Sequence, residues 1–186
     1  MCLETAQVLC GAVLNLAYGD NPSPTKPPKY IRINSSKIAF PPYVRSLGQR
    51  RHPAIKWAGM DRSHFKWVLK HFKALNAEYK LRYGRTDNYT SFTKCYAYLK
   101  SIIDLFPEKA GYEIEFQATI THIDLLNPAW SVHKKYRYAL VHKFYYLYER
   151  EPTWKNCSPP DFLFDDKILA YFRKRLGSPR RKLKRD

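Results

Sequence analysis

The first residue whose type and position suggest chemistry is Glu4. It is the only charged residue in an otherwise apolar segment, Leu3 to Ala17, which reads as a helix without a polar stripe. Burying a carboxylate is costly unless the group is paired or faces a wet cleft. Two interpretations therefore stay open. Glu4 is a general acid/base with a pKa tuned by an apolar wall, or it lies in a frayed first turn and favours the helix dipole.

Other common catalytic and metal-binding patterns are absent from the sequence. The six histidines form neither an H-E-x-x-H motif nor the cysteine and histidine spacing of a zinc finger. His64 and His71 lie two turns apart on one predicted helix, and we interpret them as a partly exposed polar pair. No glycine-rich phosphate loop and no G-x-S-x-G motif occurs. We therefore expect no metal and no cofactor.

The charge balance indicates a polyanionic partner. The chain of 186 residues carries 33 Lys and Arg against 16 Asp and Glu, a formal net charge of +17. So many uncompensated cations repel one another and oppose the compact state unless an anion is bound. Aromatic residues are interleaved with the cations, as in Tyr136-Arg137-Tyr138. Cations contact phosphates and flat rings stack on bases, so the composition favours nucleic acid.

Seven residues are predicted to contact nucleic acid: Arg50, Arg51, His52, Arg82, Arg85, Trp154 and Lys155. The first three precede the turn at Pro53 and would bind phosphates. Alternatively, they belong to a solvated loop without a binding role. Trp154 would stack on a lesion or an unpaired base. Alternatively, it packs in the hydrophobic core. Arg82 and Arg85 bracket Gly84 at a helix end, where a phosphate clamp and a carboxylate partner such as Glu78 are equally compatible with the spacing.

Several short strings then resemble a known group of proteins. They are Met1-Cys2-Leu3-Glu4-Thr5-Ala6-Gln7, Arg51-His52-Pro53 with Trp57-Ala58, Glu78-Tyr79-Lys80-Leu81-Arg82-Tyr83-Gly84-Arg85, and Pro152-Thr153-Trp154-Lys155. Their order resembles small phage proteins similar to the helical pyrimidine-dimer DNA glycosylase/AP lyase family. The likeness covers residues 1 to about 160 in scattered patches. It implies DNA repair by excision of damaged pyrimidines.

The resemblance places the family's catalytic glutamate at Glu4. It implies that an amine attacks the deoxyribose C1′, an imine forms, the damaged base leaves, and the carboxylate assists proton transfer and β-elimination. An α-amine with a pKa near 8 suits this work better than an ordinary lysine. In the family that amine is the chain's own terminus, some twenty residues before the glutamate. Here the sequence starts three residues before Glu4, so we expect a missing amino-terminal segment or lost excision chemistry. Removal of Met1 would expose the α-amine of Cys2, and Asp87 replaces a histidine of the family.

The predicted fold class is all-α, a compact helical bundle in a single domain over residues 1–176. A long Pro-rich loop over 20–51 follows the first helix, and a basic disordered tail covers 177–186. Periodic apolar residues predict further helices: one from Asp61 or Ser63 to Gly84, then Thr90–Leu105, Ser131–Glu149 and Asp161–Leu176.

Cysteine usage and hydropathy bear on where the protein works. The four cysteines lie far apart without a C-x-x-C pair, which is typical of a reducing compartment. The N-terminal apolar segment is too short to span a bilayer and has no basic start. We expect a monomer in the cytoplasm of a bacterial or phage-infected cell, without a membrane partner.

Three functions are compatible with these features. The first is a DNA-binding repair glycosylase/AP lyase that acts on damaged or distorted duplex, with Glu4 as acid/base. The second is a non-enzymatic nucleic-acid binder, either a degenerate relative or a chaperone. The third is a phage enzyme that modifies DNA bases on a related scaffold.

Overall fold

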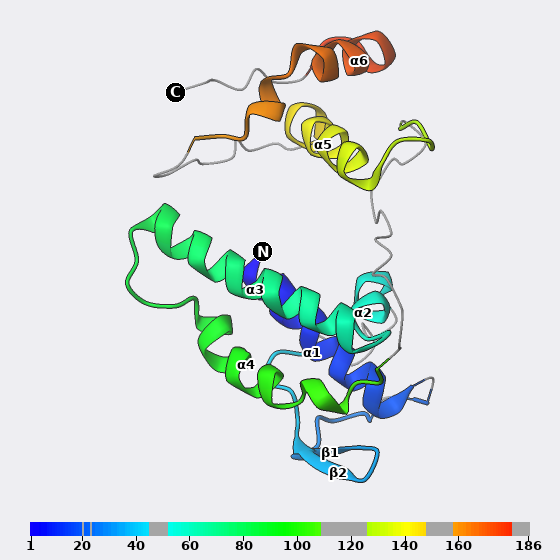
Figure 1. Cartoon of the computed structure of the whole chain (residues 1–186), viewed down its shortest axis with the longest axis vertical. Coiled ribbons are helices and arrows are strands. Elements are labelled where there is room, and N and C mark those ends of the chain that lie inside the picture. The colour runs from blue at the N-terminus through cyan, green and yellow to red at the C-terminus, as the bar shows by residue number, and fades with distance from the viewer. Residues whose placement is uncertain (20, 23, 45–51, 109–125, 148–157, 180–186) are drawn as a thin grey trace. The chain divides into compact units, whose positions relative to one another are not determined.

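The computed structural model describes residues 1–19, 21–22, 24–44, 52–108, 126–147 and 158–179. The chain divides into two compact units, Met1–Ile114 and Glu115–Asp186, and each is described by itself (Figure 1). The region expected to form a single domain, residues 1–176, thus contains two compact units. That they belong to one domain stays a prediction. Residues 180–186 of the expected tail lie outside the described residues.

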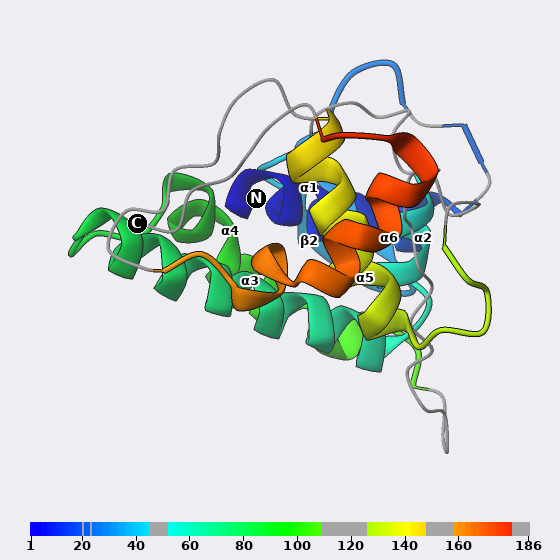
Figure 2. The ribbon, with the colours of Figure 1, turned by 90° about the horizontal axis from the view of Figure 1, so that it is seen from above.

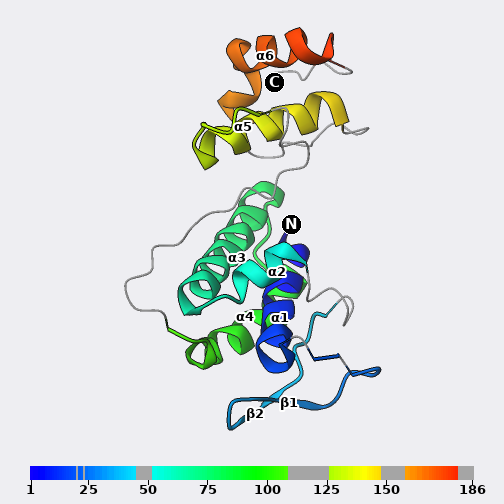
Figure 3. The ribbon, with the colours of Figure 1, turned by 90° about the vertical axis from the view of Figure 1, so that its right-hand side faces the viewer.

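The first helix, α1 (Cys2–Tyr18), forms the centre of the first unit. Its middle is buried on every side, from Leu9 to Leu14, as the lack of a polar stripe predicts. It packs against α2 (Pro53–Ala58), α3 (Arg62–Tyr83) and α4 (Thr90–Ser101). Figures 1 and 3 show α1 alongside these helices.

Helix α3 confirms the most detailed expectation from the sequence. Asp61 caps its start, because its Oδ1 accepts hydrogen bonds from the backbone N–H groups of Ser63 and His64 at 2.7 and 3.0 Å. Gly84 follows its end in the left-handed conformation, with φ 58°. Four apolar side chains of one face are buried in the core: Phe65, Val68, Leu69 and Phe72.

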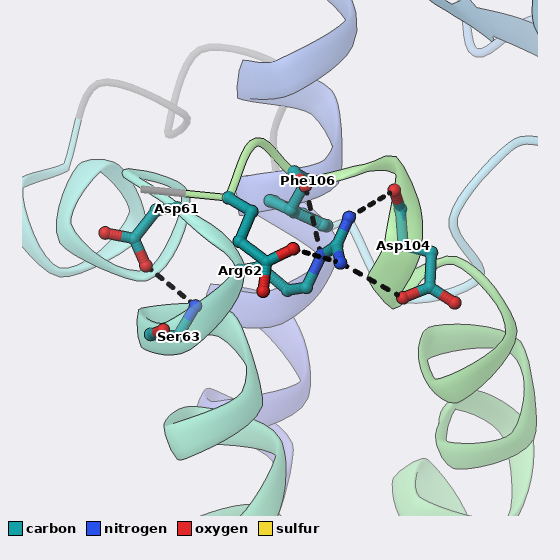
Figure 4. A network of polar contacts seen from close by, with 6 residues as sticks. Asp61, Arg62, Ser63, Asp104 and Phe106 are labelled. Atoms are coloured by element: carbon teal, nitrogen blue, oxygen red, sulfur yellow. Dashed lines mark hydrogen bonds and ion pairs between the residues drawn. The ribbon is translucent and has the colours of Figure 1, made fainter. Parts of the chain in front are cut away.

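Arg62 ties the start of α3 to the segment that follows α4 (Figure 4). Its Nη2 donates to the carbonyl of Asp104 at 3.0 Å, and its Nη1 pairs with Glu108 at 2.9 Å. Asp104 belongs to a 3₁₀ turn, η2 (Ile103–Leu105), that continues α4. The helix predicted to run from Thr90 to Leu105 therefore ends at Ser101 and tightens into this turn.

A small β-hairpin corrects the all-α expectation. Strands β1 (Tyr30–Ile33) and β2 (Ser36–Ala39) pair antiparallel within the segment predicted to be an irregular loop. The turn between them uses Asn34 with φ 53°, a conformation that asparagine tolerates. Ile31 and Ile33 join the core of the first unit. The protein is therefore mostly helical rather than purely so.

The second unit pairs α5 (Val132–His142) with α6 (Asp166–Leu176), which lie side by side in Figures 1 and 2. A π-helical turn, η4 (Lys143–Leu147), continues α5, and a 3₁₀ turn, η5 (Asp161–Phe164), precedes α6. Ser131 and Asp165 cap the two helices. The apolar faces of α5 and α6 meet the turn η5 around Val141, Leu163 and Phe172.

The cysteines that the structure describes are free thiols. Cys2, Cys10 and Cys95 are all buried, and Cys157 lies outside the described residues. A hydrogen bond with Cys95, together with burial, raises the pKa of the Cys10 thiol. Cys10 thus stays a neutral packing group between α1 and α4.

Each helix that the structure describes is too short or too polar to cross a lipid bilayer.

The cap of α3 generates a prediction about stability. Asp61 is 1% exposed, and its Oδ2 lies 2.9 Å from Nδ1 of His64. Asp61→Ala removes both contacts, so we expect the free energy of unfolding at pH 7 to fall by about 1 to 3 kcal/mol. Asp61→Asn keeps an oxygen that can accept the cap hydrogen bonds but replaces the charged Oδ2 with an NH2 group, so it should lower the free energy of unfolding by less than Asp61→Ala does.

The stability difference between the native chain and Asp61→Asn depends on pH through the pKa of Asp61. Burial raises that pKa, but hydrogen bonds from His64 and Ser63 lower it more, and it lies below its ordinary value. The charge therefore contributes stability above the ordinary carboxylate pKa, and this contribution is lost as pH falls through the folded-state pKa. Urea denaturation of the native chain and of Asp61→Asn should show a gap that narrows below about pH 4. A gap that widens towards acid pH would contradict this account.

Candidate nucleic-acid interface

The solvent-facing side of α3 carries a row of lysines. Lys66, Lys70 and Lys73 are exposed and recur at four and three residues, so they lie on one line along the helix. Within the described part of the chain, none of these lysines belongs to an ion pair. The apolar face of the same helix is in the core, so the row is fixed in direction by packing.

An aromatic pair lies among these lysines. Trp67 is 39% exposed and stacks on His71, with ring centroids 5.5 Å apart and planes 10° from parallel. Burial lowers the pKa of the His71 imidazole, which favours its neutral form. Trp67 also meets Trp57 of α2 edge to face at 5.7 Å. A large, partly exposed ring is therefore held in place among the lysines of α3.

Arg82 has the carboxylate partner that the sequence left open. Its Nε forms an ion pair with Oε1 of Glu78, one turn earlier on α3. Both side chains line a cavity of about 410 Å³ together with Met1, Cys2, Tyr79 and Tyr83. Arg85 follows Gly84 and is exposed. The two arginines therefore differ, because Arg82 is neutralised by Glu78 while Arg85 faces solvent.

Glu4 lies in the first turn of α1, where its charge favours the helix dipole. The side chain is 77% exposed, and its Oε2 lies 3.5 Å from the α-amine of Met1. Glu4 is not among the residues that line the cavity, although Met1 and Cys2 are. An exposed carboxylate has no apolar wall, so the local environment matches the alternative of a first-turn glutamate. A catalytic role for Glu4 stays a prediction.

His52 has a structural role at the start of α2. Its Nδ1 accepts a hydrogen bond from the backbone N–H of Ala54 at 3.2 Å, which caps the helix before Pro53. The ring is nevertheless exposed. The remaining predicted contacts lie outside the described residues: Arg50, Arg51, Trp154 and Lys155.

Helix α5 and the turn η4 form a second basic element without any carboxylate. Residues 132–147 include Lys134, Lys135, Arg137 and Lys143 and no Asp or Glu. The Lys134 ammonium lies 4.4 Å from the ring centroid of Trp130. On α6, the Arg175 guanidinium lies 3.6 Å from the ring centroid of Tyr171. Cations and aromatic rings are thus in direct contact in the second unit, and such pairs are stabilising.

A third basic element, the β-hairpin, was missed from the sequence. The stretch from residue 21 to residue 60 holds eight Lys and Arg and no Asp or Glu. The signal was present in the alternation Tyr30-Ile31-Arg32-Ile33, which puts the cation and the apolar side chains on opposite faces.

The described residues contain no group of three or more His, Cys, Asp or Glu side chains with the arrangement of a metal site.

Comparisons with protein families, with curated proteins and with solved structures found no match to this chain. The resemblance to the pyrimidine-dimer glycosylase family therefore rests on the short strings alone and stays a prediction.

The Glu78–Arg82 pair generates a prediction for DNA affinity. Glu78→Gln removes a negative charge beside Arg82, so we expect a short duplex to bind about twofold to threefold more tightly at low salt. Fluorescence anisotropy measures this change, with the native chain as reference. Affinity that falls in Glu78→Gln would show that the pair holds this part of α3 in place rather than weakening a DNA contact.

Proposed function

We propose that the protein binds DNA through its basic helix faces. The observation that carries this proposal is the row of exposed lysines on α3 beside Trp67, none of which forms an ion pair with a residue that the structure describes. Lysines contact phosphates without reading sequence, and a partly exposed indole suits contact with a sugar or an opened base. The carboxylate-free α5 supports the same function in the second unit.

The distribution of carboxylates also supports a polyanionic partner. Asp61 and Asp165 cap helices, and Glu78 and Glu108 form ion pairs with arginines. Asp61, Asp165 and Glu108 stabilise helix ends, and Glu78 pairs with Arg82 within α3. These acids are not spread over the lysine faces, where they would neutralise an anion-binding surface.

The proposal predicts a steep salt dependence. For the full chain on a short duplex, the affinity should fall by at least about 10³-fold between about 50 and about 200 mM salt, as for six or more neutralised phosphates. In Lys66→Gln/Lys70→Gln, the slope of log K against log[salt] should become shallower by about 2, because two phosphate contacts are lost.

The matched control is Lys94→Gln/Lys100→Gln, which removes the same charge from exposed positions on α4. It should change the slope by less than half as much. A flat salt dependence of the native chain would contradict DNA binding. Equal effects of the two variants would contradict the assignment to α3.

A second candidate function is the lyase activity that the resemblance implies. The observation that favours it is the amine of Met1 within 3.5 Å of Glu4, beside residues that line a cavity. An amine beside a carboxylate suits imine formation at a deoxyribose C1′, because the carboxylate relays the protons that the amine releases. A non-enzymatic binder shares the DNA contacts and lacks this step.

Borohydride trapping on an abasic duplex and on a dimer-containing duplex separates the two functions. A lyase gives a covalent complex, and Glu4→Gln should slow its formation about 100-fold or more. Because Glu4 is exposed, this variant should keep the native circular dichroism spectrum. If the native chain is not trapped, or if Glu4→Gln traps equally fast, Glu4 is not the acid/base of a lyase.

A further inference from the structure

The outward face of the β-hairpin has an unusual arrangement of charge. In the register of the two strands, Arg32 lies directly opposite Lys37. Both side chains are exposed, while Ile31 and Ile33 of the same ribbon are buried. Like charges at directly opposed positions of an antiparallel pair destabilise it. The fold therefore holds two cations together at a cost to its own stability.

A tyrosine brings a third cation to the same face. Tyr30 is 45% exposed, and the ammonium groups of Lys37 and Lys29 lie 4.4 and 5.5 Å from its ring centroid. These contacts hold the two lysine heads near one ring. Within the described part of the chain, neither lysine nor Arg32 takes part in an ion pair.

The hairpin is held firmly against the first unit. The Tyr98 hydroxyl of α4 donates to the carbonyl of Ala39 at 2.8 Å, and Phe40 extends the pairing through its N–H to the carbonyl of Lys29 at 3.1 Å. Burial raises the pKa of Tyr98, which keeps this hydroxyl protonated as a donor. Figures 1 and 3 show the hairpin next to the C-terminal end of α1, away from the middle of α3. These contacts fix the backbone from which the Arg32 and Lys37 side chains project.

We propose that the face formed by Lys29, Tyr30, Arg32 and Lys37 is a phosphate-binding site for the nucleic-acid backbone, separate from the lysine row of α3. This inference rests on the proposed function and adds a second contact region in the same unit. A phosphate between Arg32 and Lys37 converts their repulsion into two attractions, and the planar guanidinium of Arg32 suits bidentate binding. A two-stranded ribbon is also narrow enough to enter a major groove.

The proposal separates stability from binding. Lys37→Glu replaces the repulsion with Arg32 by a cross-strand attraction, so the melting temperature should stay the same or rise. The same change should weaken binding of a short duplex about tenfold at about 100 mM salt and make the salt slope shallower by at least about 1. A variant that simply unfolds cannot give this combination.

The matched control is Lys100→Glu, which makes the same change of charge on α4. It should weaken binding by less than about threefold. Equal losses for Lys37→Glu and Lys100→Glu, or undiminished binding by Lys37→Glu, would overturn the hairpin site and leave the proposed function standing. If the native chain shows no salt-dependent affinity, the proposed function itself fails and this inference fails with it.

Discussion

Repulsion among uncompensated cations is the constraint that the rest of this structure has to accommodate. Several of the described carboxylates act at helix ends, where Asp61 and Asp165 cap α3 and α6 and where Glu108 pairs with Arg62. These contacts stabilise local structure and screen few of the remaining cations. Most of the lysines and arginines that the structure describes have exposed side chains, and each unit has to be held together by its apolar core against their repulsion.

The cores are organised so that burial and charge lie on opposite faces of the same elements. On α3 the core contains Phe65 and Phe72, which stack or tilt against Phe106 and Phe92, while lysines occupy the other side. On β1 the isoleucines are buried, and Arg32 faces outward. Because a single element carries both faces, packing the core fixes the direction in which the cations point. The arrangement of charge is thus a consequence of the fold.

The sequence predicted those elements whose ends carry their own signals. Helix α3 has a capping carboxylate at Asp61, a regular apolar stripe and Gly84, so its bounds followed from local chemistry alone. The hairpin was missed because the alternation Tyr30-Ile31-Arg32-Ile33 is only four residues long, and so short a strand gains its stability from burial of Ile31 and Ile33 in the core of the first unit. The π-helical turn after His142 and the break at Ile102 likewise depend on packing.

The candidate site was predicted less completely than the fold. Charge and aromatic content indicated the class of partner, but the pairing of Arg82 with Glu78 and the exposure of Glu4 depend on side-chain geometry. Arg32 lies opposite Lys37 because of the register of the two strands. A segment predicted to be a loop has no register, so this pairing could not be predicted.

The melting temperature of the unliganded full chain as a function of salt tests most directly whether uncompensated cations govern this protein. The Debye length shortens as NaCl increases from about 20 to about 300 mM, so repulsion weakens and the melting temperature should rise. A short DNA duplex added at the lowest salt should raise it as well, because it binds the folded chain. A melting temperature that is constant or falls with salt would contradict the account.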